Sequence, residues 1–310
     1  MLDRIRIGTR GSALALAQSG HVGELLKQHG VCRDVQLTVI RTTGDQIQDR
    51  SLSDIGGKGL FVKEIEEALL DGRVDLAVHS MKDVPAQLAP RLVLTATLPR
   101  ERPEDVVIFR GKFHSFDEFD ENATVGTSSL RRKIQLLRKW PNLNVIPLRG
   151  NVDTRLRKLE ERAGGMEAIL LAYAGLRRLG LHGVAAIPLP VEWMIPAAGQ
   201  GILALEVREE DHALRDALYL LDDPMTAVCA RAERRFLQVL GGSCNIPVAA
   251  YATISSDRIQ MHTMLADPEG KTVLYSQGDA LHDDAEHLGE VLAHSLLLQG
   301  GQKLVPQTTR

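Results

Sequence analysis

Short apolar strands alternate with amphipathic helices up to about residue 220, and this alternation constrains the fold more than any other feature. It is typical of α/β units built on a largely parallel sheet. Two such sheets are more plausible than one sheet of nine strands. We expect strands at 4–8, 35–40, 74–79, 92–97, 105–109, 124–126, 144–148, 168–171 and 202–207, and helices at 12–28, 60–70, 128–139 and 153–162.

Two proline-bearing segments, 99–103 and 187–201, are interpreted as crossings between the two α/β units. Two connections between one pair of domains suggest a hinge with a ligand cleft beside it. The predicted first domain comprises residues 1–99 and 197–219, and the predicted second domain comprises residues 100–196. Residues 42–58 are rich in Gly, Asp and Ser and show no clear period, so we interpret them as a mobile lid.

The pattern changes at Asp222, where a helix is expected to begin with Pro224 at its first position and to end at Gly241. Strands are then expected at 248–254, 258–266 and 271–276, followed by a helix at 284–298 and a frayed tail after Gly300. These elements predict an α+β third domain over 220–310 with a three-stranded antiparallel sheet. The apolar face of its first helix is expected to comprise Met225, Val228, Cys229, Ala232, Phe236 and Leu240.

The overall charge is near neutral, at −3, which argues against nucleic acid or an anionic membrane as the main partner. No apolar run approaches the ~20 residues of a membrane span, and the N-terminus begins as an alternating strand without a visible signal peptide. A cytoplasmic location is therefore expected. Three cysteines without a Cys/His cluster suit a reducing compartment and give no support to a metal site.

Arginine dominates the basic residues: 10 of the 37 are lysine, which leaves 27 arginines. Arginine is favoured where planar carboxylates or phosphates are bound through two parallel hydrogen bonds. A high-GC codon bias would produce the same excess, so the positions of the arginines have to decide.

Three strand–turn–helix junctions, at 8–12, 126–132 and 148–155, place arginines near expected helix N-termini. A helix N-terminus binds anions readily. An arginine in the first turn, by contrast, destabilises the helix by roughly a few tenths of a kcal/mol. Any one of these arginines could be a solvated surface residue. As a set they predict an anion-lined cleft, to which Lys58, Arg177 and Arg178 would add.

The segment 79–85 directly follows a predicted strand and contains the acid/base candidate, Asp83. A carboxylate at the carboxyl end of a strand, among arginines, can orient N–H groups and transfer protons. Ser80 as a helix cap and Lys82–Asp83 as a solvated pair are the plain structural alternatives. His79 is expected to be a hydrogen-bonded structural residue.

Cys244 lies just past a helix end, between glycines and Pro247, where a thiol can project from a fixed loop. Cys229, and Cys32 with less support, fit the usual role of cysteine as a small buried apolar residue. No histidine lies near Cys244 in the sequence, so a cysteine hydrolase has no specific support.

Seven motifs in order resemble the porphobilinogen deaminase (hydroxymethylbilane synthase) family over about residues 4–295. They lie at 10–18, 56–61, 79–85, 125–132, 149–152, 196–201 and around Cys244. Two departures affect loop detail: Gly242-Ser243 precedes Cys244 where two glycines are more common, and 42–45 differs slightly from the usual basic-Gly-Asp run.

The resemblance implies three domains, the first two like those of a periplasmic binding protein, in a monomeric transferase of porphyrin and heme biosynthesis. It implies that Cys244 carries a dipyrromethane cofactor through a thioether and that Asp83 assists loss of ammonia from porphobilinogen. Four units would be joined and released by hydrolysis as the linear tetrapyrrole hydroxymethylbilane. Implied cofactor contacts besides Asp83 and Cys244 are Lys82, Thr127, Ser128, Ser129, Arg131 and Arg132. Implied substrate contacts are Arg10, Ser12, Lys58, Arg149, Arg155 and Arg178.

The main alternative is a two-lobed binding protein that holds an organic polycarboxylate without catalysis. It explains the arginines, but it gives no reason for Asp83 or Cys244.

Overall fold

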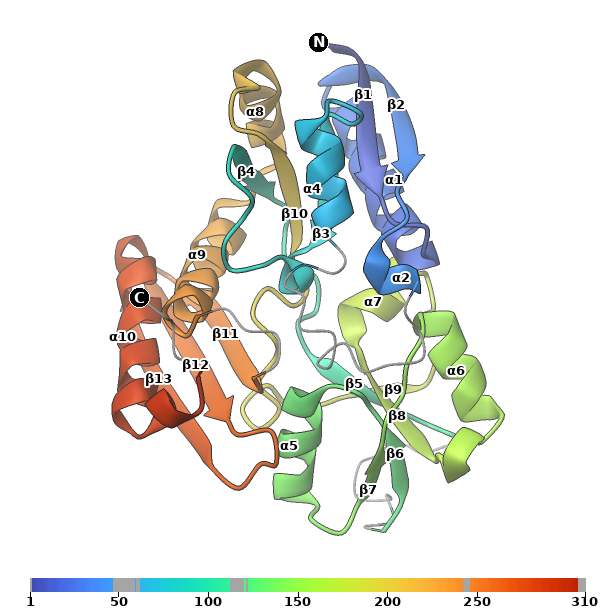
Figure 1. The fold of residues 1–310 in the computed structure, drawn as a ribbon, viewed down its shortest axis with the longest axis vertical. Coiled ribbons are helices and arrows are strands. Elements are labelled where there is room, and N and C mark those ends of the chain that lie inside the picture. The colour runs from blue at the N-terminus through green and yellow to red at the C-terminus, as the bar shows by residue number, and fades with distance from the viewer. Residues whose placement is uncertain are drawn as a thin grey trace.

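The computed structural model describes residues 2–46, 59, 62–111, 120, 122–241 and 246–305. Within these ranges the strands form three sheets, each with its own helices (Figure 1). The predicted fold class, two α/β units and a small α+β unit with a three-stranded antiparallel sheet, is confirmed.

The first sheet has the strand order β2-β1-β3-β10-β4. Its strands are β1 (Leu2–Thr9), β2 (Cys32–Val39), β3 (Leu76–Ser80), β4 (Leu92–Thr97) and β10 (Leu203–Arg208). Its helices are α1 (Ala13–Gln28), α2 (Thr43–Gln46), α4 (Lys63–Leu70) and α8 (His212–Leu218).

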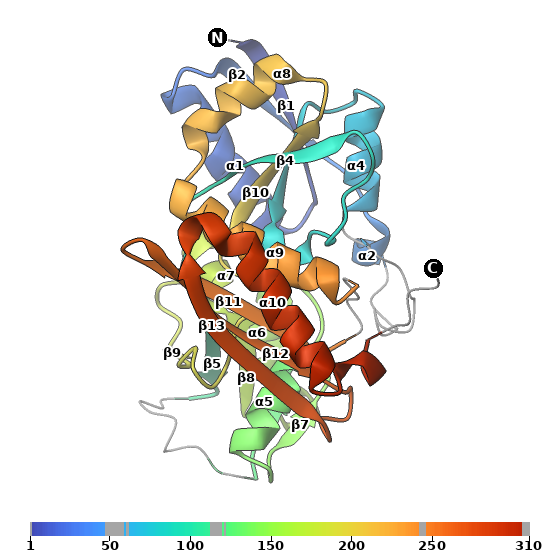
Figure 2. The same ribbon diagram turned by 90° about the vertical axis from the view of Figure 1, so that its left-hand side faces the viewer.

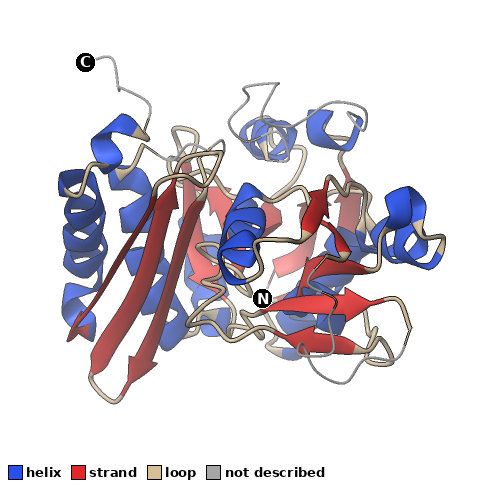
Figure 3. Ribbon diagram, turned by 90° about the horizontal axis from the view of Figure 1, so that it is seen from below, coloured by secondary structure: helices blue, strands red, loops and turns tan. Residues whose placement is uncertain are grey.

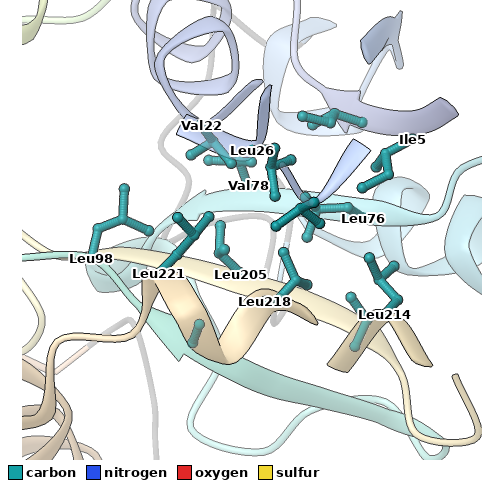
Figure 4. Packing of buried hydrophobic residues seen from close by; sticks show 14 of the residues in the cluster. Ile5, Val22, Leu26, Leu76, Val78, Leu98, Leu205, Leu214, Leu218 and Leu221 are labelled. Atoms are coloured by element: carbon teal, nitrogen blue, oxygen red, sulfur yellow. The ribbon is translucent and has the colours of Figure 1, made fainter. Parts of the chain in front are cut away.

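One face of this sheet packs against α1 and α8. Leucines and valines of the strands meet Val22 and Leu26 of α1 and Leu214 and Leu218 of α8, as Figure 4 shows. The opposite face packs against α4 through Ile65 and its neighbours. Apolar burial on both faces fixes the strand ends that carry the candidate site.

The second sheet has the order β7-β6-β8-β5-β9. Its strands are β5 (Asp105–Phe109), β6 (Thr124–Gly126), β7 (Asn144–Ile146), β8 (Ala168–Ala172) and β9 (Ala186–Pro188), and its helices are α5 (Leu130–Lys139), α6 (Val152–Glu160) and α7 (Tyr173–Arg178). The short strand β9 was not expected from the sequence.

The third sheet comprises β11 (Val248–Ser255), β12 (Arg258–Ala266) and β13 (Val273–Leu281). Two helices, α9 (Pro224–Val239) and α10 (Ala285–Leu298), cover one face (Figures 2 and 3). Its other face meets α5 of the second unit, where Ile134 packs against Ala249 and Met264. Single 3-10 turns are found at Met81–Asp83, Ala163–Gly165, Tyr219–Leu221, His282–Asp284 and Gly301–Lys303.

The two five-stranded sheets are largely parallel, as expected, but one strand in each runs in the opposite direction. In the first sheet β10 runs antiparallel to β3 and β4, and in the second sheet β5 runs antiparallel to β8 and β9. Both strands follow directly on a crossing from the other unit, β5 after residues 98–104 and β10 after residues 189–202. Each therefore enters its sheet from the opposite end.

Two smaller expectations about the third unit are also wrong. Met225 does not belong to the apolar face of α9, because it is 55% exposed in the first turn. The chain after Gly300 does not fray at once: residues 301–303 form a 3-10 turn, and Leu304 and Val305 pack on the core of α9 and α10. Most of the proposed lid, 47–58, lies outside the described residues.

Candidate active site

The candidate acid lies in a segment that we name the acid loop, residues 80–86. The buried strand β3 ends at Ser80, and a 3-10 turn over Met81–Asp83 follows. The backbone N–H of Met81 donates to the carbonyl of Ile202 at 3.0 Å, and that of Val84 donates to the carbonyl of Met81 at 3.0 Å. With Met81 buried beneath it, Asp83 is exposed beyond the carboxyl end of β3, where α/β sheets bind ligands.

Arg10 and Asp83 line one small pocket, together with Ala15, Gln18, Val62, Ile65, Val78, His79 and Ser80. The side chains of Gln18 and Ser80 close part of its wall through a 3.0 Å hydrogen bond from Nε2 to Oγ. The first strand–turn–helix junction and the acid loop therefore meet, as the cleft hypothesis requires.

His79 is held inside the protein, as expected for a structural histidine. Its Nε2 lies 2.9 Å from Oε2 of Glu206, and both side chains are almost completely buried. Glu206 on β10 was not recognised from the sequence. A single acid in an otherwise apolar strand was the available signal, since such residues are rarely buried unless paired.

Several cations gather around Asp83. Desolvation and, after it, the charge of Arg132 lower the pKa of Lys82 to about 8, while the charge of Asp83 acts in the opposite direction. Desolvation likewise lowers the pKa of Arg155 to about 10, with contributions from Arg132 and Arg149 that Asp83 opposes. Such mutual effects require that these groups lie close together. The structure thus brings residues of two different sheets into one charged cluster.

Arg131 and Arg132 are buried and already bind a carboxylate of the protein. Arg131 Nη1 lies 2.6 Å from Asp105 Oδ2, and Arg132 Nε lies 2.9 Å from Asp105 Oδ1. Each guanidinium also donates to a backbone carbonyl, that of Ile195 or that of Leu170. Burial alone would raise the pKa of Asp105, but the two guanidinium charges hold it well below its usual range.

Gln200 connects this ion cluster to the acid loop and was missed in the sequence analysis. Its Nε2 donates to Asp105 Oδ1 at 3.0 Å and to the carbonyl of Pro103 at 2.7 Å, and its Oε1 lies 3.4 Å from Lys82 Nζ. Gln200 and Pro103 lie in the two crossings, so the connection joins both crossings to Lys82. The sequence analysis treated Asp105 only as the first residue of a strand. Its place directly before four apolar residues was the signal that the carboxylate is buried.

The hydroxyl residues of the predicted set are engaged locally. Ser12 caps α1 by accepting from the N–H of Ala15, and Ser129 caps α5 by accepting from the N–H of Arg132. Thr127 Oγ1 accepts from the N–H of Ser129 at 3.2 Å. Ser128 Oγ bonds to the backbone of Leu148, which joins the second junction to the third.

The remaining predicted residues fall into three groups. Arg149 and Arg155 belong to the cation cluster, and Arg155 Nε also donates to the carbonyl of Gly150 at 2.7 Å. Arg178 lies at the second crossing, where its Nη2 donates to the carbonyl of Gly201 at 2.6 Å. Lys58 and Cys244 lie outside the described residues.

Replacing Asp105 with Asn is expected to destabilise the fold by about 3–5 kcal/mol, because two buried guanidinium groups would lose their carboxylate. Its pKa is lowered in the folded chain, so this stabilisation is present above about pH 4 and is lost as the pH falls further. Chemical denaturation between pH 3 and pH 7 tests both statements.

The exposed pair Arg4–Asp34 supplies a matched control for that experiment. Asp34→Asn is expected to cost less than about 1 kcal/mol. Equal losses in the two variants would contradict the structural role given to Asp105.

The cluster fits a ligand that carries several carboxylates. Its cations are Lys82, Arg131, Arg132, Arg149 and Arg155, and they outnumber the carboxylates Asp83 and Asp105. Since like charges held together in a desolvated region repel one another, a bound polyanion would relieve the repulsion. Within the described ranges no group of three or more His, Cys, Asp or Glu side chains is arranged to hold a metal ion.

Two family models match almost the whole chain. The model described as "Porphobilinogen deaminase, dipyromethane cofactor binding domain" matches residues 5–216, and "Porphobilinogen deaminase, C-terminal domain" matches residues 227–298. The chain belongs to the porphobilinogen deaminase family. The resemblance drawn from the seven motifs is thereby confirmed, and the part of the chain that contains Asp83 and the cation cluster is the part that binds the dipyrromethane cofactor in this family.

Relatives in the family match over their full length. The porphobilinogen deaminase of Thiobacillus denitrificans is 46% identical over 305 residues, which cover 98% of each chain. That of Syntrophomonas wolfei is 42% identical over 309 residues, which cover all of both chains.

Solved structures of periplasmic type give weaker matches. One is the second substrate-binding domain of a putative amino acid ABC transporter from Streptococcus pneumoniae, with 11% identity and a TM-score of 0.42 over 76% of this chain and 98% of that chain. A match of this size carries no argument about function. None of the helices in the described ranges is long and apolar enough to cross a membrane.

Proposed function

We propose that this chain removes ammonia from porphobilinogen and joins four units head to tail on a covalently held dipyrromethane. Hydrolysis then releases the linear tetrapyrrole hydroxymethylbilane. The observation that carries the proposal is the cluster of cations around a single exposed aspartate at the carboxyl end of β3. Each pyrrole bears two carboxylates, so a growing chain needs many cations along its path.

Cys244 is the proposed attachment point of the cofactor. Burial raises the pKa of Cys229 to about 12, an effect to which the charge of Glu233 adds, and burial also raises the pKa of Cys32. Both thiols are therefore poor nucleophiles. In the sequence, Cys244 comes five residues after Val239, the last residue of α9.

Asp83 is the proposed catalytic residue. The aminomethyl group reacts as its ammonium form: when the C–N bond breaks, ammonia leaves with the bonding electrons, and the positive charge of the ammonium passes to the pyrrole. The Asp83 carboxylate stabilises this charge by accepting a hydrogen bond from the pyrrole N–H. It then takes the proton that the attacking α-carbon loses as the new C–C bond forms. The bound dipyrromethane supplies the free α-carbon from which the chain grows.

The proposed contacts divide as the family resemblance implies. Lys82, Thr127, Ser128, Ser129, Arg131 and Arg132 are assigned to the cofactor, and Arg10, Ser12, Lys58, Arg149, Arg155 and Arg178 to incoming porphobilinogen. Arg131 and Arg132 would use the N–H groups that Asp105 leaves free. The proposed domains are 1–99 with 197–219, 100–196 and 220–310, in a monomer of the cytoplasm.

Incubation of the purified chain with porphobilinogen tests the activity. We expect four ammonia molecules to be released for each linear tetrapyrrole formed. Saturable binding of porphobilinogen without ammonia release would instead support the two-lobed binding protein.

The kcat/KM for porphobilinogen is expected to fall above about pH 8. The Lys82 ammonium, with its pKa lowered to about 8, becomes neutral there and loses its attraction for the carboxylates of the cofactor, whose free end porphobilinogen must reach. Lys82→Arg is expected to move this fall upward by at least about one pH unit, because arginine stays charged. Lys63→Arg on the exposed surface of α4 is the control and should leave the profile unchanged. An identical fall near pH 8 in Lys82→Arg would contradict the assignment.

A further inference from the structure

We infer that Arg234 and Gln238 of α9 are positioning residues that fix the acid loop relative to the helix that leads into the cysteine. This inference rests on the proposed function, and it gives α9 a task in turnover besides carrying the cysteine.

The contacts run from one face of α9 to the backbone of the acid loop. Arg234 Nη2 donates to the carbonyls of Pro85 and Ala86, both at 3.1 Å, and Gln238 Nε2 donates to the carbonyl of Ala86 at 3.2 Å. The two side chains are four residues apart, so they lie on the same face of the helix. They hold the backbone two and three residues after Asp83.

The acid loop is held from the other side as well. Its incoming half is fixed to the first unit by the hydrogen bond from Met81 to Ile202. Gly199 presses on this half so closely that a Cβ there would lie 2.6 Å from Met81 Cγ. Met81 of this half also packs against Ala230 of α9. The outgoing half, at Pro85 and Ala86, receives its side-chain hydrogen bonds from Arg234 and Gln238. Asp83 therefore lies between a half that is fixed by the first unit and by apolar packing and a half that α9 holds through hydrogen bonds.

The Arg234 guanidinium loses hydration at this position, which is energetically unfavourable and argues against a chance contact. Desolvation lowers its pKa, and the charge of Glu206 opposes the shift. Glu206 is the buried partner of His79, and its Oε1 has no hydrogen-bond partner in the described structure. A partly buried charge such as that of Arg234 is seldom the most stabilising way to join two segments, because apolar residues of similar volume are often as stabilising. A hydrogen-bonded cation, however, defines the position of two carbonyl oxygens.

The proposed chemistry requires that the position of the acid loop is fixed. The reacting pyrrole is tethered at one end to the chain that α9 leads into, and it must meet Asp83 at hydrogen-bond distance at the other. A misplacement of about 1 Å between reacting groups can cost about 100-fold in rate. Loss of the Arg234 contacts should therefore lower kcat, while the carboxylate contacts that set KM remain.

Intact mass, melting temperature and steady-state kinetics of four variants test the inference: Arg234→Met, Arg234→Lys, Gln238→Met and the control Arg235→Met. Arg235 is the next residue on α9, but its guanidinium is turned toward α10, where Nη2 donates to Glu290 Oε2 at 2.7 Å. Mass spectrometry first establishes that each variant carries the covalent cofactor.

We expect all four variants to carry the cofactor. In Arg234→Met, kcat should fall about 10- to 100-fold with KM within about threefold of wild type. Arg234→Lys should recover at least about a third of the activity, Gln238→Met should lose about threefold in kcat, and Arg235→Met should be normal.

Wild-type kcat in Arg234→Met, or an equal loss in Arg235→Met, would overturn the inference. If Arg234→Met does not fold, a normal kcat in Gln238→Met would overturn it in the same way. A wild-type protein without covalent cofactor would overturn the proposed function itself, which keeps the two failures apart.

Discussion

Asp83→Asn is expected to fold normally and to lose about 100- to 10,000-fold in turnover, the usual contribution of a positioned acid or base. The side chain is exposed at the end of a turn that is held by backbone hydrogen bonds of Met81 and Val84, so stability should change by less than about 0.5 kcal/mol. The amide keeps the shape of the carboxylate, but it brings no negative charge to the pyrrole and cannot take up the proton.

The measurement is single-turnover ammonia release from porphobilinogen, with the covalent cofactor verified by mass. Loading needs only two additions in the lifetime of the protein, so even a slow variant can become loaded. Asp71→Asn, an exposed substitution in the same unit, serves as the control and should be fully active. More than about a tenth of wild-type turnover in Asp83→Asn would remove Asp83 from the catalytic role.

Cys244→Ser is expected to abolish turnover altogether. A serine hydroxyl is a far weaker nucleophile than a thiolate, so the dipyrromethane should not become attached. Without the tether, the growing chain would diffuse away and the advantage of an intramolecular reaction would be lost.

Cys32→Ala is the matched control for this substitution, because Cys32 is 2% exposed in the core of the first unit. It should lower stability modestly and leave the specific activity unchanged. Sustained synthesis of hydroxymethylbilane by Cys244→Ser would rule out Cys244 as the attachment point.

The element order could be predicted from the sequence because periodicity and helix caps are local. The strands at 92–97, 105–109, 124–126 and 258–266 agree with the structure residue for residue. Ser12 and Ser129 cap the helices that follow them, as their positions before apolar-periodic segments indicate. Strand direction could not be predicted in the same way, because β5 and β10 owe theirs to the crossings between the units.

The charged residues of the candidate site could be predicted from the sequence, because the residue type alone gives their charge. Asp83 lines a small pocket with Arg10 of the first junction, and its charge acts on Arg155 of the third, because the carboxyl ends of strands and the adjoining helix starts lie near one another. Sequence reasoning did not identify the partners inside the protein. Asp105 binds Arg131 and Arg132, and Gln200 connects Asp105 to Lys82. These contacts join residues that are up to 118 positions apart in the sequence. No local pattern encodes such long-range pairs.

A further buried pair at the base of the third unit was missed for the same reason. Glu233 of α9 is fully buried and accepts from Arg100, from the N–H of Gly199 and from the N–H of Ala252. It thus joins α9 to both crossings and to β11. In the sequence Glu233 is a single acid among arginines and alanines, a pattern that is typical of a solvent-exposed helix position.

Intact mass spectrometry of the purified wild-type chain tests the central claim most directly. The proposed chemistry predicts a protein heavier than its sequence by two porphobilinogen units less two ammonia molecules, with the addition on the peptide that contains Cys244. A fully active protein whose mass equals that of its sequence would contradict a covalently primed enzyme.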